Sequence, residues 1–130
     1  MNRAKILVVD DVPENIHTLK NLLKDDYTIA AATNGQKAIE IAQKEPLPDL
    51  IILDILMPQM DGYEVCQKLK SIEATQDIPI IFVTSLSDAD EQDRGIALGA
   101  VDYISKPITP LLTKQRIATH LKLRECQKGL

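Results

Sequence analysis

The chain has 130 residues, 45% hydrophobic and 26% charged, which is typical of one globular domain and leaves no room for a second. A formal charge of -4, 3% aromatic residues and the lack of tryptophan argue against direct nucleic-acid binding. The two cysteines, Cys66 and Cys126, have neither CxxC nor metal-binding spacing and indicate free thiols in a reducing compartment. Because no segment is typical of a signal peptide or a membrane span, we expect a cytoplasmic protein.

Five segments of the chain are predicted to form β-strands. Three of them are short and almost continuously apolar, which is typical of strands buried on both faces of a parallel sheet: residues 6–9, 50–53 and 78–83. Residues 27–31 and 102–105 mix polar with apolar side chains, as strands at or near an open edge do. The sequence therefore predicts three central strands and two edge strands.

The segments between these strands have the apolar spacing of helices. They cover residues 13–23, 36–43, 63–71, 88–98 and a last segment from about 110 to beyond 123. The fourth is acidic at its start and stops at Gly99, as the helix dipole and a glycine terminus favour. Strand and helix thus alternate five times, which predicts an α/β domain with a doubly wound parallel sheet and right-handed crossovers.

Polar residues stand directly after four of the predicted strands, where doubly wound sheets bind their ligands. They are Asp10 with Asp11, Asp54, Thr84 and Lys106. An aspartate pair alone is more often a turn or a helix cap, but three carboxylates meeting at one edge repel by ~4 kcal/mol per pair at ~4 Å. A cation that neutralises them, with open positions for phosphate, describes a magnesium site. Lys106 and Thr84 suit the oxygens of a phosphoryl group.

Four motifs together resemble the receiver domain of two-component response regulators, of the chemotaxis-regulator type. They are residues 5–11 (KILVVDD), 53–62 (LDILMPQMDG), 83–85 (VTS) and 99–107 (GAVDYISKP), and the resemblance extends over about residues 4–122. It implies a flavodoxin-like fold with strand order 2-1-3-4-5. It also implies a receiver domain at residues 1–122, N-terminal in a larger response regulator, with residues 123–130 as the end of the last helix or the start of a linker to an output domain.

The resemblance assigns the central chemistry to Asp54. This residue would accept a phosphoryl group from a histidine kinase or a phosphotransfer protein and become an aspartyl phosphate. Asp11, Asp54 and the backbone carbonyl of Leu56 would bind Mg²⁺, and Asp10 would orient a metal-bound water. The expected activity is self-phosphorylation and autodephosphorylation rather than conventional enzymatic turnover.

Other positions receive supporting roles from the same resemblance. Thr84 and Lys106 would hold the transferred phosphoryl group. Tyr103 matches the family's switch aromatic, which turns inward as Thr84 moves toward the phosphoryl group. The Lys106–Pro107 peptide is expected to be cis, and Gly62 is expected to relieve a tight turn. His17 and His120 lie on predicted helices, and we expect both to be solvated, so the phosphohistidine belongs to another chain.

Phosphorylation is expected to change the face formed by the helix at 88–98, the strand at 102–105 and the last helix, through which family members bind partners or form homodimers. The end of the chain resembles receivers placed ahead of cyclic-dinucleotide phosphodiesterase, cyclase or kinase modules, although an output domain need not exist.

Three other readings compete with a phosphorylated receiver. A haloacid-dehalogenase-type phosphohydrolase requires a second acid two residues after its nucleophile, where Leu56 stands. A nucleotide- or flavin-binding module requires a glycine-rich loop after the first strand, where the chain is acidic. The third is an unphosphorylated protein-binding domain, against which the full set of polar residues argues.

Overall fold

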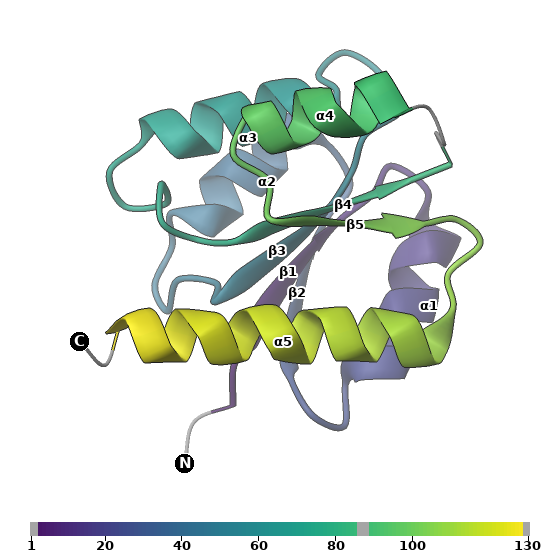
Figure 1. Cartoon of the computed structure of the whole chain (residues 1–130), viewed down its shortest axis with the longest axis vertical. Coiled ribbons are helices and arrows are strands. Elements are labelled where there is room, and N and C mark those ends of the chain that lie inside the picture. The colour runs from purple at the N-terminus through teal and green to yellow at the C-terminus, as the bar shows by residue number, and fades with distance from the viewer. Residues whose placement is uncertain (1–2, 86–88, 129–130) are drawn as a thin grey trace.

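The computed structural model describes residues 3–85 and 89–128 and shows a five-stranded parallel sheet between two layers of helices (Figure 1). The strand order is β2-β1-β3-β4-β5, so the sheet is doubly wound from β1. This confirms the predicted fold class and strand order. The strands are β1 Lys5–Val9, β2 Thr28–Ala32, β3 Leu50–Asp54, β4 Ile80–Thr84 and β5 Asp102–Ser105.

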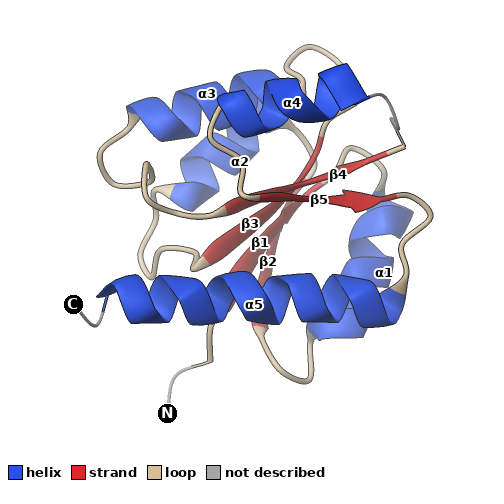
Figure 2. Ribbon diagram, in the orientation of Figure 1, coloured by secondary structure: helices blue, strands red, loops and turns tan. Residues whose placement is uncertain are grey.

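The helices follow the strands in strict alternation. They are α1 Pro13–Leu23, α2 Gly35–Ala42, α3 Gly62–Ser71, α4 Ala89–Ala97 and α5 Pro110–Lys128. Figure 2 shows α1 and α5 on one face of the sheet and α2, α3 and α4 on the other. Each layer encloses its own apolar core, because alternate side chains of the central strands point to opposite faces.

The central strands are buried as their apolar composition predicts. Every residue of β3 and β4 is buried, whereas β2 and β5 at the sheet edges carry partly exposed positions. Several predicted strand boundaries are wrong by one or two residues. The fourth strand begins at Ile80 rather than residue 78, because Pro79 has no amide hydrogen and contributes only its carbonyl, which accepts from Ile51 N. The second strand begins at Thr28 rather than Tyr27.

Two helices begin at residues whose side chains cap the first helical turn. Asn34 Oδ1 accepts from Lys37 N at 2.8 Å and starts α2 at Gly35, one residue before the predicted start. Asp61 Oδ1 accepts from Glu64 N at 2.9 Å and starts α3. The start of the fourth helix was expected at residue 88, which lies outside the described residues.

Within the described part of the chain, no helix is both long enough and apolar enough to cross a bilayer. Cys66 is buried with a free thiol, as expected, while the side chain of Cys126 lies outside the described residues.

Candidate functional site

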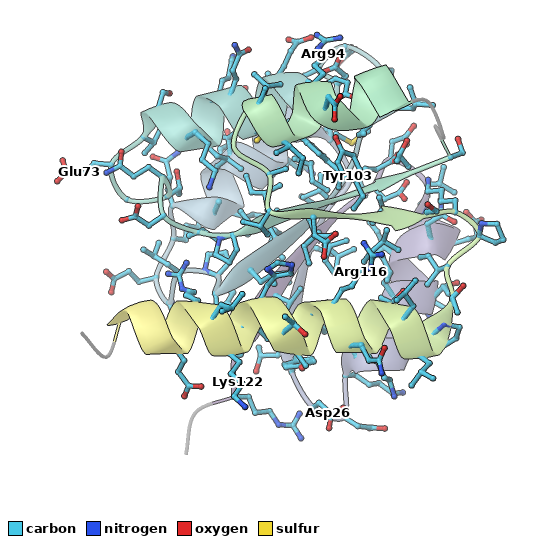
Figure 3. All side chains as sticks on the ribbon, viewed as in Figure 1. Asp26, Glu73, Arg94, Tyr103, Arg116 and Lys122 are labelled. Atoms are coloured by element: carbon cyan, nitrogen blue, oxygen red, sulfur yellow. The ribbon has the colours of Figure 1, made fainter. Side chains whose placement is uncertain are left out.

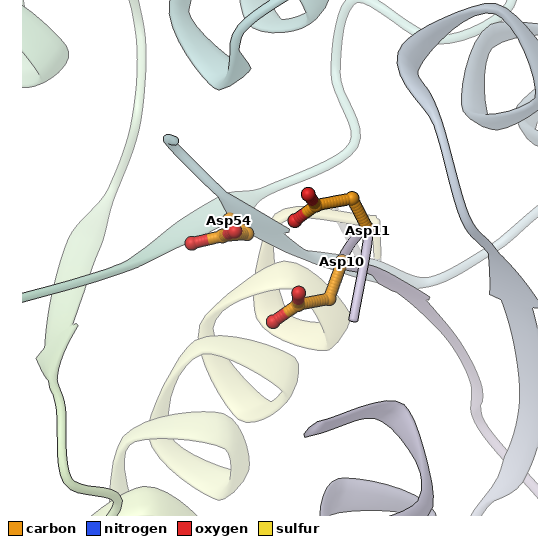
Figure 4. Close-up of side chains that lie close together, drawn as sticks. All are labelled: Asp10, Asp11 and Asp54. Carbon is orange, nitrogen blue, oxygen red and sulfur yellow. The ribbon is translucent and has the colours of Figure 1, made fainter. Parts of the chain in front are cut away.

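Three carboxylates converge at the carboxyl edge of the sheet (Figure 4). Asp10 and Asp11 directly follow β1, and Asp54 is the last residue of the neighbouring strand β3. One carboxylate oxygen from each lies within 4.8 Å of the other two. Asp10 and Asp54 are buried, and Asp11 is half-buried and therefore open to solvent on one side. The predicted acidic cluster is thus brought together by strand pairing.

The loop after β1 holds Asp10 in a fixed position. Its amide donates to Ala32 O at 3.2 Å, and its Oδ1 accepts from Val12 N at 2.9 Å. Pro13 then begins α1, where a missing amide hydrogen costs no hydrogen bond. One carboxylate oxygen of Asp10 is therefore used by the backbone, and its Oδ2 faces Lys106 at 3.6 Å.

Lys106 reaches across the sheet from the end of β5. Its Nζ donates to Asp54 Oδ1 at 3.1 Å, and its amide donates to Thr84 O at 2.9 Å. The Lys106–Pro107 peptide is cis, as expected. Among the described residues, Lys106 is the cation found within 4.0 Å of Asp10 or Asp54.

The electrostatics of the cluster are unfavourable without a further positive charge. Burial raises the pKa of Asp54, the carboxylates of Asp10 and Asp11 raise it further, and Lys106 opposes them. One ammonium thus faces three carboxylates, of which those of Asp10 and Asp54 are buried. Hard carboxylate oxygens with an open side fit a divalent cation such as Mg²⁺, which prefers few protein ligands and keeps several waters.

Thr84 and Leu56 flank this cluster in different ways. Thr84 ends β4, is 1% exposed, and pairs in register with Ser105. Leu56 is 57% exposed, and because its side chain is a hydrocarbon, only its backbone carbonyl could contribute to a metal site. Both residues lie at the edge where the sequence analysis expects them.

Gly62 has a different role from the one expected. The residue with positive φ in this loop is Gln59, at 70°, so Gly62 is not needed for a left-handed backbone conformation. Gly62 N donates to Ile55 O at 2.8 Å, and an added Cβ would lie 2.4 Å from Asp54 O. A glycine is therefore needed so that the start of α3 can pack against the backbone beside Asp54.

Tyr103 lies half-buried between β5 and α4 (Figure 3). Its ring packs on Phe82 with centroids 5.8 Å apart and planes tilted by 41°. Phe82 in turn meets the ring of Tyr63 edge-on at 5.4 Å. The expected switch aromatic is thus oriented inward in this structure.

A polar cluster between β5 and α5 was missed. Arg116 Nη1 donates to Asp102 Oδ1 at 2.6 Å and also to the carbonyl of Tyr103, and His120 Nε2 lies 2.9 Å from Asp102 Oδ2. The expectation that His120 is solvated is wrong, because its side chain is 16% exposed and paired. The i, i+4 spacing of the two basic residues opposite Asp102 is the sequence signal for this contact.

Fold and site together define a doubly wound α/β domain whose carboxyl edge carries an acidic cluster that could hold a metal ion. The chain belongs to the response regulator receiver domain family, whose profile matches residues 6–118. It is therefore a receiver domain of two-component signalling, a phosphorylation-switch family rather than a typical enzyme family. Receiver domains interact with histidine kinases and phosphotransfer proteins, and are generally dependent on Mg²⁺.

Known proteins resemble the chain over nearly its whole length. It is 43% identical to a "Probable cyclic di-GMP phosphodiesterase" of Vibrio cholerae and 39% identical to "Response regulator PleD" of Caulobacter vibrioides. These matches cover 94% and 92% of this chain but 27% of each relative. The crystallised signal receiver domain of a histidine kinase from Syntrophus aciditrophicus has 36% identity and a TM-score of 0.83, with 92% of this chain and 90% of that one covered. The chain thus spans about a quarter of the length of these two curated relatives.

Proposed function

We propose that Asp54 of this chain accepts a phosphoryl group from a histidine kinase or a histidine phosphotransfer protein. The observation that supports this most directly is the convergence of Asp10, Asp11 and Asp54 with Lys106 at one edge of the sheet. Such a site places a nucleophilic carboxylate beside groups that neutralise the incoming charge.

In the proposed transfer, an Asp54 carboxylate oxygen forms a bond to phosphorus while the bond from phosphorus to the donor imidazole nitrogen breaks. The electron pair of that bond stays on the imidazole, which takes up a proton. Lys106 already donates to Asp54 Oδ1 at 3.1 Å and would follow the developing charge onto the phosphoryl oxygens. Thr84 would donate its hydroxyl to one of the same oxygens.

Asp10, Asp11, Asp54 and the Leu56 carbonyl would hold the Mg²⁺, with Asp10 acting through a bound water. When bound, the ion neutralises the carboxylates, so that an anionic donor can approach an anionic nucleophile. The reverse reaction, with water as acceptor, would make the domain dephosphorylate itself. The cytoplasmic location expected from the sequence belongs to this proposal, since the proposed donors are two-component kinases.

The signal would leave through the α4–β5–α5 face, formed by Ala89–Ala97, Asp102–Ser105 and Pro110–Lys128. As Thr84 moves toward the phosphoryl group, the space that it leaves would favour the inward orientation of Tyr103, which alters the surface offered to a partner or to a second copy. The relatives from Vibrio cholerae and Caulobacter vibrioides are about four times longer than this chain, which suggests an output module after the receiver segment. The Vibrio cholerae relative favours a cyclic-dinucleotide phosphodiesterase for that module.

Intact-mass spectrometry tests the assignment of Asp54. The chain is incubated with acetyl phosphate and Mg²⁺, and we expect the mass of one phosphoryl group to be added and then removed by hydroxylamine, which cleaves acyl phosphates. Asp54→Asn should not gain the mass. Asp61→Asn is the matched control, because asparagine also caps a helix and Asp61 caps α3. Equal labelling of Asp54→Asn and the wild type would exclude Asp54 as acceptor.

A further inference from the structure

α4 brings Gly95 into close contact with aromatic side chains of β4 and β5. Gly95 is buried, and a Cβ added there would lie 2.0 Å from Tyr103 Oη and 2.8 Å from Phe82 Cδ2 and Cε2. Real Cβ atoms essentially never come closer than 3.0 Å to another heavy atom. Two aromatic rings therefore occupy the volume that any side chain at position 95 would need.

This glycine has no other evident reason to stand in a helix. Glycine is a poor helix former, because it loses more backbone freedom than alanine. α4 does not need Gly95 to end, since Gly99 provides the left-handed residue after the helix with φ 110°. The space that Gly95 leaves open thus explains why the position is not alanine.

The two rings differ in how easily they can move away. Phe82 is 0% exposed and lies between Tyr63 and Tyr103, with ring centroids at 5.4 and 5.8 Å. Tyr103 is half-buried on the edge strand β5, below α4 in Figure 3, and rotation about its side-chain bonds can carry it toward solvent. A methyl group at position 95 would therefore displace Tyr103 rather than Phe82.

Tyr103 lies on the same face of the sheet as Thr84, which ends β4 at the proposed phosphoryl site. Phe82 pairs with Tyr103 and Thr84 pairs with Ser105, so Phe82, Thr84 and Tyr103 project from the same face of the sheet. The inward position of Tyr103 is bounded by Phe82 and Gly95, and Thr84 lies on the same face of the sheet, toward the acidic edge. A change at Phe82 or Gly95 alters the room available to the ring.

We infer that Gly95 is a positioning residue that admits Tyr103 to its inward orientation and thereby sets how strongly phosphorylation at Asp54 is coupled to the α4–β5–α5 face. Only the coupling to phosphorylation in this inference rests on the proposed function. The control of Tyr103 by the size of residue 95 is a property of the unphosphorylated domain. Coupling is reciprocal, so a side chain that disfavours inward Tyr103 must also weaken binding of a phosphoryl mimic.

The first measurement examines Tyr103 without phosphorylation. The chain has three tyrosines, so 3-fluorotyrosine labelling gives three ¹⁹F resonances, which single Tyr→Phe variants assign. In Gly95→Ala, the Tyr103 resonance should shift toward that of the unfolded chain and become more sensitive to a soluble paramagnetic agent. Asp93→Ala, an exposed substitution on the same helix, should leave it unchanged. An unchanged Tyr103 resonance in Gly95→Ala overturns the inference, whatever the chain does with phosphodonors.

The second measurement examines the coupling. Affinity for beryllofluoride in the presence of Mg²⁺ should fall by about five- to tenfold in Gly95→Ala, at the lower end of typical coupling between sites. In a Tyr103→Ala background, the same Gly95→Ala change should alter affinity by less than about twofold, because the ring it displaces is absent. An equal loss in both backgrounds would mean that residue 95 acts through α4 or Phe82 and would overturn the inference.

The outcomes separate this inference from the proposed function. If the wild type does not bind beryllofluoride, the proposed phosphoacceptor is wrong, while the ¹⁹F result still decides whether Gly95 positions Tyr103. If Gly95→Ala does not fold, the double variant Gly95→Ala/Tyr103→Ala should fold, since the 2.0 Å contact is with Tyr103 Oη. A double variant that remains unfolded would contradict the role assigned to Tyr103.

Discussion

Replacement of Asp54 by asparagine should stabilise the domain when no divalent cation is present. At an effective dielectric constant of 20, each of the carboxylates of Asp10 and Asp11, within 4.8 Å, repels Asp54 by about 3.5 kcal/mol. Lys106, at 3.1 Å, attracts it by about 5 kcal/mol. The repulsions exceed the attraction, and burial of the charge adds to the imbalance, so we expect the free energy of unfolding to rise by about 1–3 kcal/mol in Asp54→Asn.

The assay is urea unfolding at pH 7 and low salt in EDTA, with Asp61→Asn as the control that should remain within about 0.5 kcal/mol of the wild type. Thermal unfolding should show a midpoint higher by roughly 5–10 °C for Asp54→Asn. Saturating Mg²⁺ should stabilise the wild type by about 2.7 kcal/mol at one hundred times its dissociation constant, and the variant by less. An Asp54→Asn protein less stable than the wild type in EDTA would refute the claim that repulsion dominates this site.

The difference in the free energy of unfolding between Asp54→Asn and the wild type should also depend on pH. The pKa of Asp54 is raised, chiefly by burial and then by Asp10, so the folded chain binds this proton more tightly than the unfolded chain does. The contribution of Asp54 to the free energy of unfolding of the wild type therefore rises as the pH falls from neutral, through the raised pKa, toward the ordinary value of 3.8. The advantage of Asp54→Asn in EDTA should shrink over that range. An advantage that grows on acidification would contradict the assigned direction.

Three further substitutions test the packing around the site and beyond it. Gly62→Ala should lower the free energy of unfolding by about 1–3 kcal/mol, because its Cβ would lie 2.4 Å from Asp54 O; a loss below about 0.5 kcal/mol in urea would contradict this. Thr75→Val should cost about 1–2 kcal/mol, since the buried Thr75 Oγ1 donates to Leu69 O at 2.6 Å, and Thr75→Ser should keep most of that bond. Lys106→Met should lower the free energy of unfolding by about 2–4 kcal/mol in EDTA and by less in Mg²⁺. Equal losses of stability in both conditions would exclude charge as the cause.

Much of the fold follows from the apolar pattern of the chain. The runs at residues 6–9 and 50–53 are too uniformly apolar for anything but central strands, and both are fully buried. The polar residues that end those strands had to meet at one edge, because parallel strands share a direction. That is why Asp10, Asp11 and Asp54 could be grouped before any coordinates were known.

Other features depend on approaches between distant segments that a linear pattern does not carry. The need for glycine at position 62 arises from the backbone of Asp54, and the need at position 95 arises from the ring of Tyr103. His120 looked like a solvated helix residue, because its partner Asp102 lies on another element. The Glu45–Pro46 peptide is cis, and nothing local in the sequence distinguishes it from an ordinary prolyl bond.

The ion pair between Lys106 and Asp54 joins residues of two strands that are not neighbours in the sheet. Lys106 follows the edge strand β5, Asp54 ends β3, and β4 must be inserted between them, in register, before the two side chains can meet. Slippage of β5 by one position would turn Tyr103 and its neighbours to the wrong face and withdraw the lysine. The contact at 3.1 Å is therefore completed only when the sheet is fully ordered. Fraying of β5 alone would separate the lysine from the acid while leaving most of the core intact, so chemical competence at this edge reports whether the edge strand β5 is in place.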